Sequence, residues 1–188
     1  MYLEAALLGL IIGWLRGGSF KKLGQAELRY WLLALLGFAL QAVIWADFQL
    51  GRHFLSAWIP GLHIISYLPL LLFVYENLEK PGMALLGTGT FLNFSAIAFN
   101  GGRMPVSVYA VPEQFRQQLI SGSNSPLHAA MTNETLLPFL GDLIGIPLIW
   151  NKVVSAGDLL ISLGLLLLAH GLIKAKKEAP YRHSHSIR

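Results

Sequence analysis

The sequence predicts an all-α integral membrane protein with a bundle of about five transmembrane helices and one long structured extracytoplasmic loop. Of its 188 residues, 54% are hydrophobic and only 13% are charged, whereas a soluble domain carries about 25% charged residues. Several apolar stretches approach the roughly 20 residues that a helix needs to cross the ~30 Å hydrocarbon core. Basic residues cluster between these stretches and at the carboxyl end, which indicates membrane topology rather than a nucleic-acid-binding face. We therefore expect the lipid bilayer as a partner, and no nucleic acid.

The predicted helices follow the apolar stretches, because backbone in hydrocarbon must satisfy its hydrogen bonds internally. Met1–Leu15 lacks a basic n-region and contains Glu4, so we interpret it as a retained helix. It spans only if the turn that follows lies deep in the interface, and a half-inserted helix is the alternative. The further spans are predicted at Leu28–Ala46, Phe54–Leu78, Met83–Phe99 and Ser155–Ile173. The chain divides into a transmembrane helical domain, residues 1–173, and a basic tail, residues 174–188.

The distribution of Lys and Arg predicts the orientation. Ten basic residues fall on the side of the tail and four on the side of the long loop. The positive-inside rule therefore places the tail in the cytoplasm and the amino terminus outside. Five spans put the two ends on opposite sides, which agrees with the charges. We expect a multi-pass protein of the plasma (inner) membrane, its tail adhering to anionic lipid.

The predicted extracytoplasmic loop covers residues 100–154, which is too long for an ordinary connection. Glu113–Ile120 has the pattern of an amphipathic helical turn, and Leu127–Leu140 resembles a further helix. Leu136–Trp150 is strongly apolar but is interrupted by two prolines and an aspartate. These interruptions favour an interfacial or re-entrant segment over a spanning helix.

The segment Asn100–Pro105 opens the loop with two glycines, followed by Arg103. Backbone amides beside glycine can approach an anion closely, and Arg103 could bind phosphate or carboxylate through two parallel hydrogen bonds. The alternative, which the chemistry alone favours, is a glycine-capped helix end with Arg103 as an interfacial anchor.

Three further loop residues carry titratable groups. Asp142 lies among leucine and isoleucine, where desolvation raises the pKa of a carboxyl unless a cation such as Arg103 pairs with it. It is either a substrate-binding or acid/base carboxylate, or half of a structural Asp–Arg pair. Asp158, three residues after Ser155, predicts a capping box, and the alternative is a carboxylate pair with Asp142. His128 is a candidate base or a satisfied loop histidine, and because its spacing to other ligands matches no metal motif we expect neither a metal nor a cofactor.

These segments resemble an uncharacterised bacterial family of small polytopic membrane proteins, a domain of unknown function. The resemblance rests on the Asn-Gly-Gly-x-Met-Pro motif that begins at Asn100, on His128 followed by Leu137–Asp142, and on Ser155–Leu160. It covers most of the chain, from the second predicted helix to the fifth. Membership implies that these loop residues act together, and it implies no reaction, substrate or cofactor.

The loop is expected to fold back over the bundle and gather the candidate residues on one extracytoplasmic face: Asn100, Arg103, His128, Asp142 and Asp158. The leading hypothesis is binding or transport of a small anionic or lipid-like ligand, with Arg103 as the anion contact. The second is an accessory subunit of a larger membrane complex, with the loop as its docking surface. The third is a membrane-embedded acid/base enzyme that pairs Asp142 with Asp158 or His128. The sequence leaves open whether the protein is an enzyme.

Overall fold

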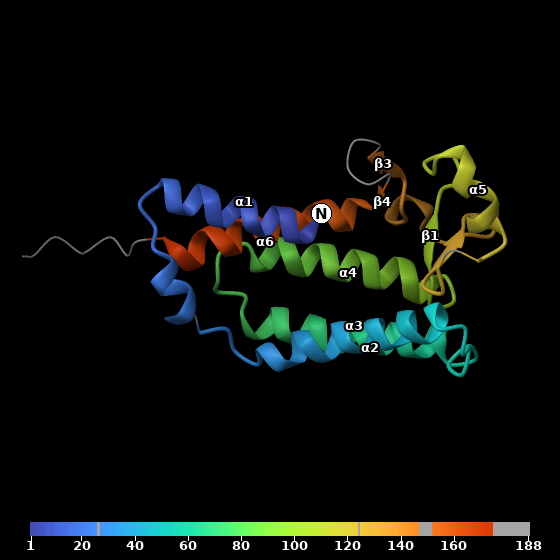
Figure 1. Ribbon diagram of the computed structural model, residues 1–188, viewed down its shortest axis with the longest axis horizontal. Helices are drawn as coiled ribbons and strands as arrows, with labels where there is room; N and C mark the ends of the chain where they lie inside the picture. The colour runs from blue at the N-terminus through green and yellow to red at the C-terminus, as the bar shows by residue number, and fades with distance from the viewer. Residues whose placement is uncertain (26, 124, 147–151, 175–188) are drawn as a thin grey trace, which may run out of the picture.

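The computed structural model describes residues 1–25, 27–123, 125–146 and 152–174. It is mostly helical, with long helices side by side and a few short strands gathered at one end (Figure 1). The predicted tail lies outside the described residues except for Lys174, as does the final part of the predicted re-entrant segment, residues 147–150.

The long helices of the described chain are α1 (Tyr2–Leu15), α2 (Trp31–Gln49), α3 (Ile59–Glu76), α4 (Met83–Phe99) and α6 (Ala156–Ile173). By length and composition, α2, α3 and α6 could cross a membrane, which suggests that the protein associates with one. The apolar helices α1 and α4 are shorter, at 14 and 17 residues. A short 3-10 helix, η1 (Phe20–Gln25), follows α1.

Two helices begin later than predicted, and backbone conformation gives the reason. Tyr30, just before α2, and His53, ahead of α3, have positive φ angles of 51° and 55°. A right-handed helix cannot run through a residue in the left-handed region. The predicted start at Leu28 was therefore too early. The predicted start at Phe54 was also too early, because residues 54–58 form turns between His53 and α3, whereas Met83–Phe99 has the bounds predicted for it.

The helices pack as a row in the order α1, α6, α4, α3, α2. The contact between α4 and α6 is close because small residues face each other there. A Cβ added to Gly157 would lie 2.0 Å from Asn93 Oδ1, and one added to Gly89 would lie 2.3 Å from the Gly157 carbonyl oxygen. Among these helices, the two at the ends of the row, α1 and α2, do not pack closely against each other.

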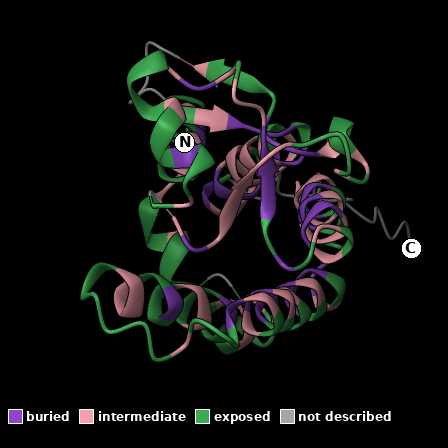
Figure 2. Cartoon of the chain, turned by 90° about the vertical axis from the view of Figure 1, so that its right-hand side faces the viewer, coloured by how far each residue is buried: buried purple, intermediate pink, exposed green. Residues whose placement is uncertain are grey.

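Residues 100–123, 125–146 and 152–155 form a small folded unit over one end of the row, which we call the cap (Figure 1). Its central strand, β1 (Met104–Val106), pairs in parallel with β2 (His128–Ala130) and, on its other side, forms a bridge to Asp142. A second pair, β3 (Ile144–Ile146) and β4 (Lys152–Val154), is antiparallel. Viewed from this end, buried residues lie where the cap meets the helices and exposed residues surround them (Figure 2).

The observed structure of the cap agrees in part with the predicted loop and differs from it in part. The helix α5 (Glu113–Ile120) has the bounds of the predicted amphipathic turn. The predicted helix at Leu127–Leu140 was wrong, because this segment contains β2 and the 3-10 helix η2 (Pro138–Leu140). Hydrogen bonds to β1 hold it extended: the Met104 amide donates to the Leu127 carbonyl at 2.8 Å, and the Met131 amide to the Val106 carbonyl at 2.9 Å.

The described part of the predicted re-entrant segment, residues 136–146, contains η2 and β3 and no long helix, which agrees with the interruptions seen in the sequence. Its entry into a membrane stays a prediction. The cap, the start of α6 and the amino end of α1 share one end of the row, and α6 ends at the other (Figure 1).

Candidate functional site

A cavity of about 630 Å³ lies between the helices beneath the cap. All five long helices contribute to its wall. At the end away from the cap the wall of the cavity is apolar. The residues there include Phe38, Leu70, Phe73, Leu86, Leu165 and Leu168. Its cap end is polar, and the residues there include Tyr2, His63, Asn93, His128, Asp142 and Asp158. The cavity is therefore amphipathic along its length.

Asp158 and its partners fix one side of the polar end. Ser155 and Asp158 form the predicted capping box: the Ser155 hydroxyl accepts from the Asp158 amide at 2.9 Å, and Asp158 Oδ2 accepts from the Ser155 amide at 3.0 Å. Asp158 Oδ1 also accepts from Asn93 Nδ2 at 2.7 Å and from the Tyr2 hydroxyl. The Ser155 hydroxyl donates to Asn93 Oδ1 at 2.8 Å. Asp158, a member of the capping box of α6, thus also connects α6 to α1 and α4 by hydrogen bonds.

Asp142 lines the same cavity from the cap, and hydrogen bonds to the β1 segment hold its main chain. Its amide donates to the Pro105 carbonyl, and its carbonyl accepts from the Ser107 amide, both at 2.9 Å. The side chain is only 7% exposed, with Oδ2 3.9 Å from His128 Nε2. Oδ1 is buried and has no hydrogen-bond partner. Burial, reinforced by the negative charge of Asp158, raises the pKa of Asp142 to about 8, so this carboxyl group mostly carries a proton near neutral pH.

Two histidines face the same polar end. His128 Nδ1 shares a hydrogen bond of 2.8 Å with the Ser125 hydroxyl. Burial lowers the pKa of His128, against the opposing charge of Asp158, so the ring is neutral at neutral pH. His63 is buried, and its Nδ1 donates to the Gly102 carbonyl at 2.8 Å, because a carbonyl oxygen can only accept. In the neutral ring this leaves His63 Nε2 as an acceptor.

The structure brings together three of the five candidate residues that the sequence indicated. His128, Asp142 and Asp158 line the cavity, whereas Asn100 and Arg103 line a separate surface pocket of about 290 Å³. Asn100 is the C-cap of α4, and its side chain bonds both the amide and the carbonyl of Leu136, at 2.9 and 2.8 Å. It therefore positions the cap.

Arg103 points away from the cavity because side chains alternate along an extended chain. Its neighbour Met104 lines the cavity, whereas Pro105, one position further, lines the same surface pocket as Arg103. Within the described chain, the basic side chain within 4 Å of the Asp142 carboxyl is His128, at 3.9 Å, and not the predicted Arg103. The residues of the polar end that lie outside the five predicted candidates are Tyr2, His63 and Asn93, whose contacts join segments far apart in the chain.

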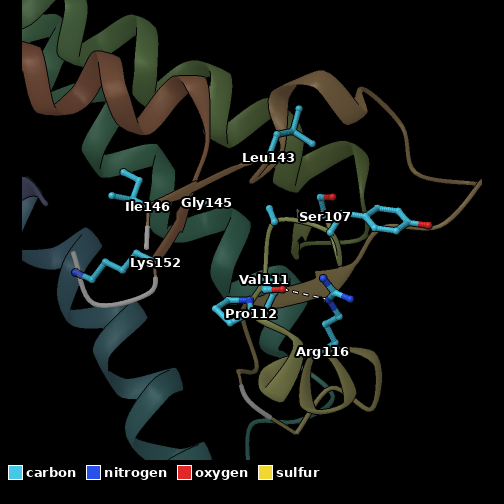
Figure 3. A pocket seen from close by; sticks show the side chains of 10 residues that line it. Ser107, Val111, Pro112, Arg116, Leu143, Gly145, Ile146 and Lys152 are labelled. Carbon is cyan, nitrogen blue, oxygen red and sulfur yellow. Dashed lines mark hydrogen bonds between the residues drawn. The ribbon is translucent and has the colours of Figure 1, made fainter. Parts of the chain in front are cut away.

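The cap carries a second pocket, of about 530 Å³, on its outer side (Figure 3). Ser107, Val111 and Leu143 contribute to it together with two cations, Arg116 and Lys152. Arg116 Nε donates to the Val111 carbonyl at 3.2 Å, the contact dashed in Figure 3. The basic groups of the cap thus lie on its surface, and none of the described residues that line the cavity is a lysine or arginine.

Comparison with known proteins identifies a family without an assigned activity. Residues 25–170 match the family described as "Family of unknown function (DUF5317)", and the chain belongs to it. An uncharacterized protein of Thermotoga maritima is 26% identical over 169 residues, which cover 89% of each chain. No solved structure matches. The expected membership of a family of unknown function is confirmed, and the Asn-Gly-Gly-x-Met-Pro motif as its signature stays a prediction.

Proposed function

We propose that this member of the DUF5317 family is a multi-pass membrane protein that binds an amphipathic, lipid-like ligand. The apolar chain of the ligand lies between the helices, and its polar head lies beneath the cap. The observation that carries the proposal is the 630 Å³ cavity, which is apolar along the helices and polar at the cap.

The outward faces of the helices support a membrane location. Large apolar side chains such as Leu35, Leu36, Leu72 and Phe91 are about half exposed on the surface. Extensive exposed apolar surface is unfavourable in water and typical of contact with lipid. In the proposed topology the five long helices span the plasma membrane, and the shorter α1 and α4 lie beside the longer α6. The excess of basic residues on the side of the carboxyl end supports an orientation with that end in the cytoplasm and the cap outside.

The cavity suits one small amphipathic molecule. Its volume lies within the range of about 300–1,000 Å³ typical of ligand sites, which are mostly apolar with a few placed polar groups. Ala6 of α1 and Ala34 of α2 both line it, although these two helices are not closely packed against each other. In this proposal the ligand reaches the cavity from the bilayer, between α1 and α2.

The test introduces a large side chain of α2 into the cavity. Ala34 lines the cavity, whereas Ala42 of the same helix is exposed, so Ala34→Phe and Ala42→Phe are a matched pair. Native mass spectrometry of gently extracted protein should show a bound small amphipathic molecule with the wild type and Ala42→Phe, and much less with Ala34→Phe. Ala34→Leu is a smaller change to use if the phenylalanine prevents folding.

Two results would contradict the proposal. Equal retention by the two phenylalanine variants would mean that the molecule binds elsewhere. A co-purifying protein with no small molecule on any variant would instead favour the accessory-subunit hypothesis.

A further inference from the structure

The polar end of the cavity indicates which head group the ligand carries, an inference that rests on the proposed function. We propose that the head is a primary ammonium group, bound between the carboxyl groups of Asp142 and Asp158. The ligand class is thus a long-chain amine or another lipid with a free amino head.

The first argument is the balance of donors and acceptors. Asp142 Oδ1 is a buried acceptor without a partner in a side chain that is only 7% exposed. Asp158 accepts in its bonds to Tyr2, Asn93 and the Ser155 amide. His63 Nε2 is an acceptor because Nδ1 donates to Gly102. A buried polar atom without a partner is unfavourable, so the site fits a head that donates several hydrogen bonds, and an ammonium group has three donors.

The second argument is charge. The cavity wall contains two carboxyl groups and no lysine or arginine among its described residues. The basic residues Arg103, Arg116 and Lys152 line pockets on the surface of the cap instead. An anionic head such as a phosphate would meet like charge in a poorly solvated space, whereas a cation would neutralise it. The wall therefore opposes the anionic ligand that the sequence suggested.

Binding of an ammonium head should release a proton from Asp142. The groups that face this carboxyl are His128 of β2, Asp158 of α6, Tyr2 of α1 and Tyr67 of α3. None of them is a cation near neutral pH when His128 is neutral, so an incoming ammonium would be the positive charge that ionises Asp142. The carboxyl proton then passes to solvent as the ammonium–carboxylate pair forms, and the ammonium keeps its three protons.

The experiment compares octylamine, 1-octanol and octyl phosphate, which share a chain and differ in the head. Isothermal titration is carried out at pH 7 on the full chain in lipid nanodiscs, with empty nanodiscs as the blank. Octylamine should bind at least about tenfold more tightly than the other two, the factor expected from one charge-assisted hydrogen bond. Asp142→Asn should remove that preference, whereas Glu134→Gln, which neutralises an exposed carboxylate of the cap, should not.

A second measurement needs no variant. Titrations of octylamine in two buffers of different ionisation enthalpy should report release of about one proton per amine bound. Octanol or octyl phosphate binding as tightly as octylamine would overturn the ammonium head and leave the chain-binding function standing. Amine binding without proton release would overturn the ionisation of Asp142 by the amine. Failure of all three probes to bind would overturn the proposed function itself.

Discussion

Gly157→Ala adds one methyl group at a close contact between α4 and α6. The new Cβ would lie 2.0 Å from Asn93 Oδ1 and 2.8 Å from the Gly89 carbonyl oxygen. Neither neighbour can move freely: Gly89 is main chain inside α4, and Asn93 is bonded to both Ser155 and Asp158. The helices must therefore separate, or Asn93 must leave the polar end of the cavity.

The expected magnitude follows from three contributions. Overpacking of a close contact costs about 1–3 kcal/mol. Loss of the Asn93–Ser155 hydrogen bond adds about 1 kcal/mol, and the gain in helix propensity on replacing glycine by alanine offsets about 1 kcal/mol. We expect Gly157→Ala to lower the free energy of unfolding by about 1–3 kcal/mol. The same change at Gly61 of α3, where nothing lies within 4 Å of the added Cβ, should raise it by up to about 1 kcal/mol.

The assay is a titration of the protein from mild-detergent micelles into SDS, followed by the loss of helical circular dichroism. Gly157→Ala should unfold at a lower SDS fraction than the wild type, and Gly61→Ala at an equal or higher one. The reasoning is refuted if both variants shift alike, or if Gly157→Ala matches the wild type, because the close contact would then not constrain the helices.

The other predictions concern the cap. Gly101 and Gly102 both have positive φ, so alanine at either adds left-handed strain of about 1–2 kcal/mol. Only at Gly102 would the Cβ also meet the Pro60 backbone, at 2.4 Å, so Gly102→Ala should unfold at a clearly lower SDS fraction than Gly101→Ala, and equal losses would contradict this. For Asp142 the folded pKa of about 8 lies above the unfolded value of about 3.9, so its stabilising contribution is complete below the unfolded pKa and is lost as pH rises through 8. The stability of wild type relative to Asp142→Asn should therefore fall from pH 5 to about 8 and level off above that pH, measured by the same titration at each pH. A constant difference would show that Asp142 is not buried as described.

Local patterns in the sequence predicted what depends on local interactions. An apolar stretch bounded by Gly82 and Asn100 gave the bounds of α4. The amphipathic spacing of Glu113–Ile120 gave α5, and the Ser155/Asp158 spacing gave the capping box. The left-handed Tyr30 carries no comparable signal, because tyrosine is not among the residue types enriched at positive φ.

The candidate site was predictable only in part, because its remaining contacts are non-local. Tyr2 and Asp158 are separated by 156 positions, and His63 and Gly102 by 39. Pairing of β1 with β2 depends on a parallel register that no turn between them specifies. That register is also what separates Arg103 from Asp142: charge alone suggested a pair, and the alternation along the extended chain puts the two side chains on different faces.

The packing of α1 against α6 bears on how the protein is made. About 140 residues of chain lie between these helices, so at ~5–20 residues per second the ribosome completes α6 roughly 10–30 s after α1. During that interval α1 has emerged without the helix it packs against, and α4 has its glycine face uncovered. Arrival of α6 covers both helices at once and brings Asp158 to Tyr2. Assembly of the cavity is therefore a late event of translation, and a chain released before α6 would have an open row of helices with no wall between α1 and α4.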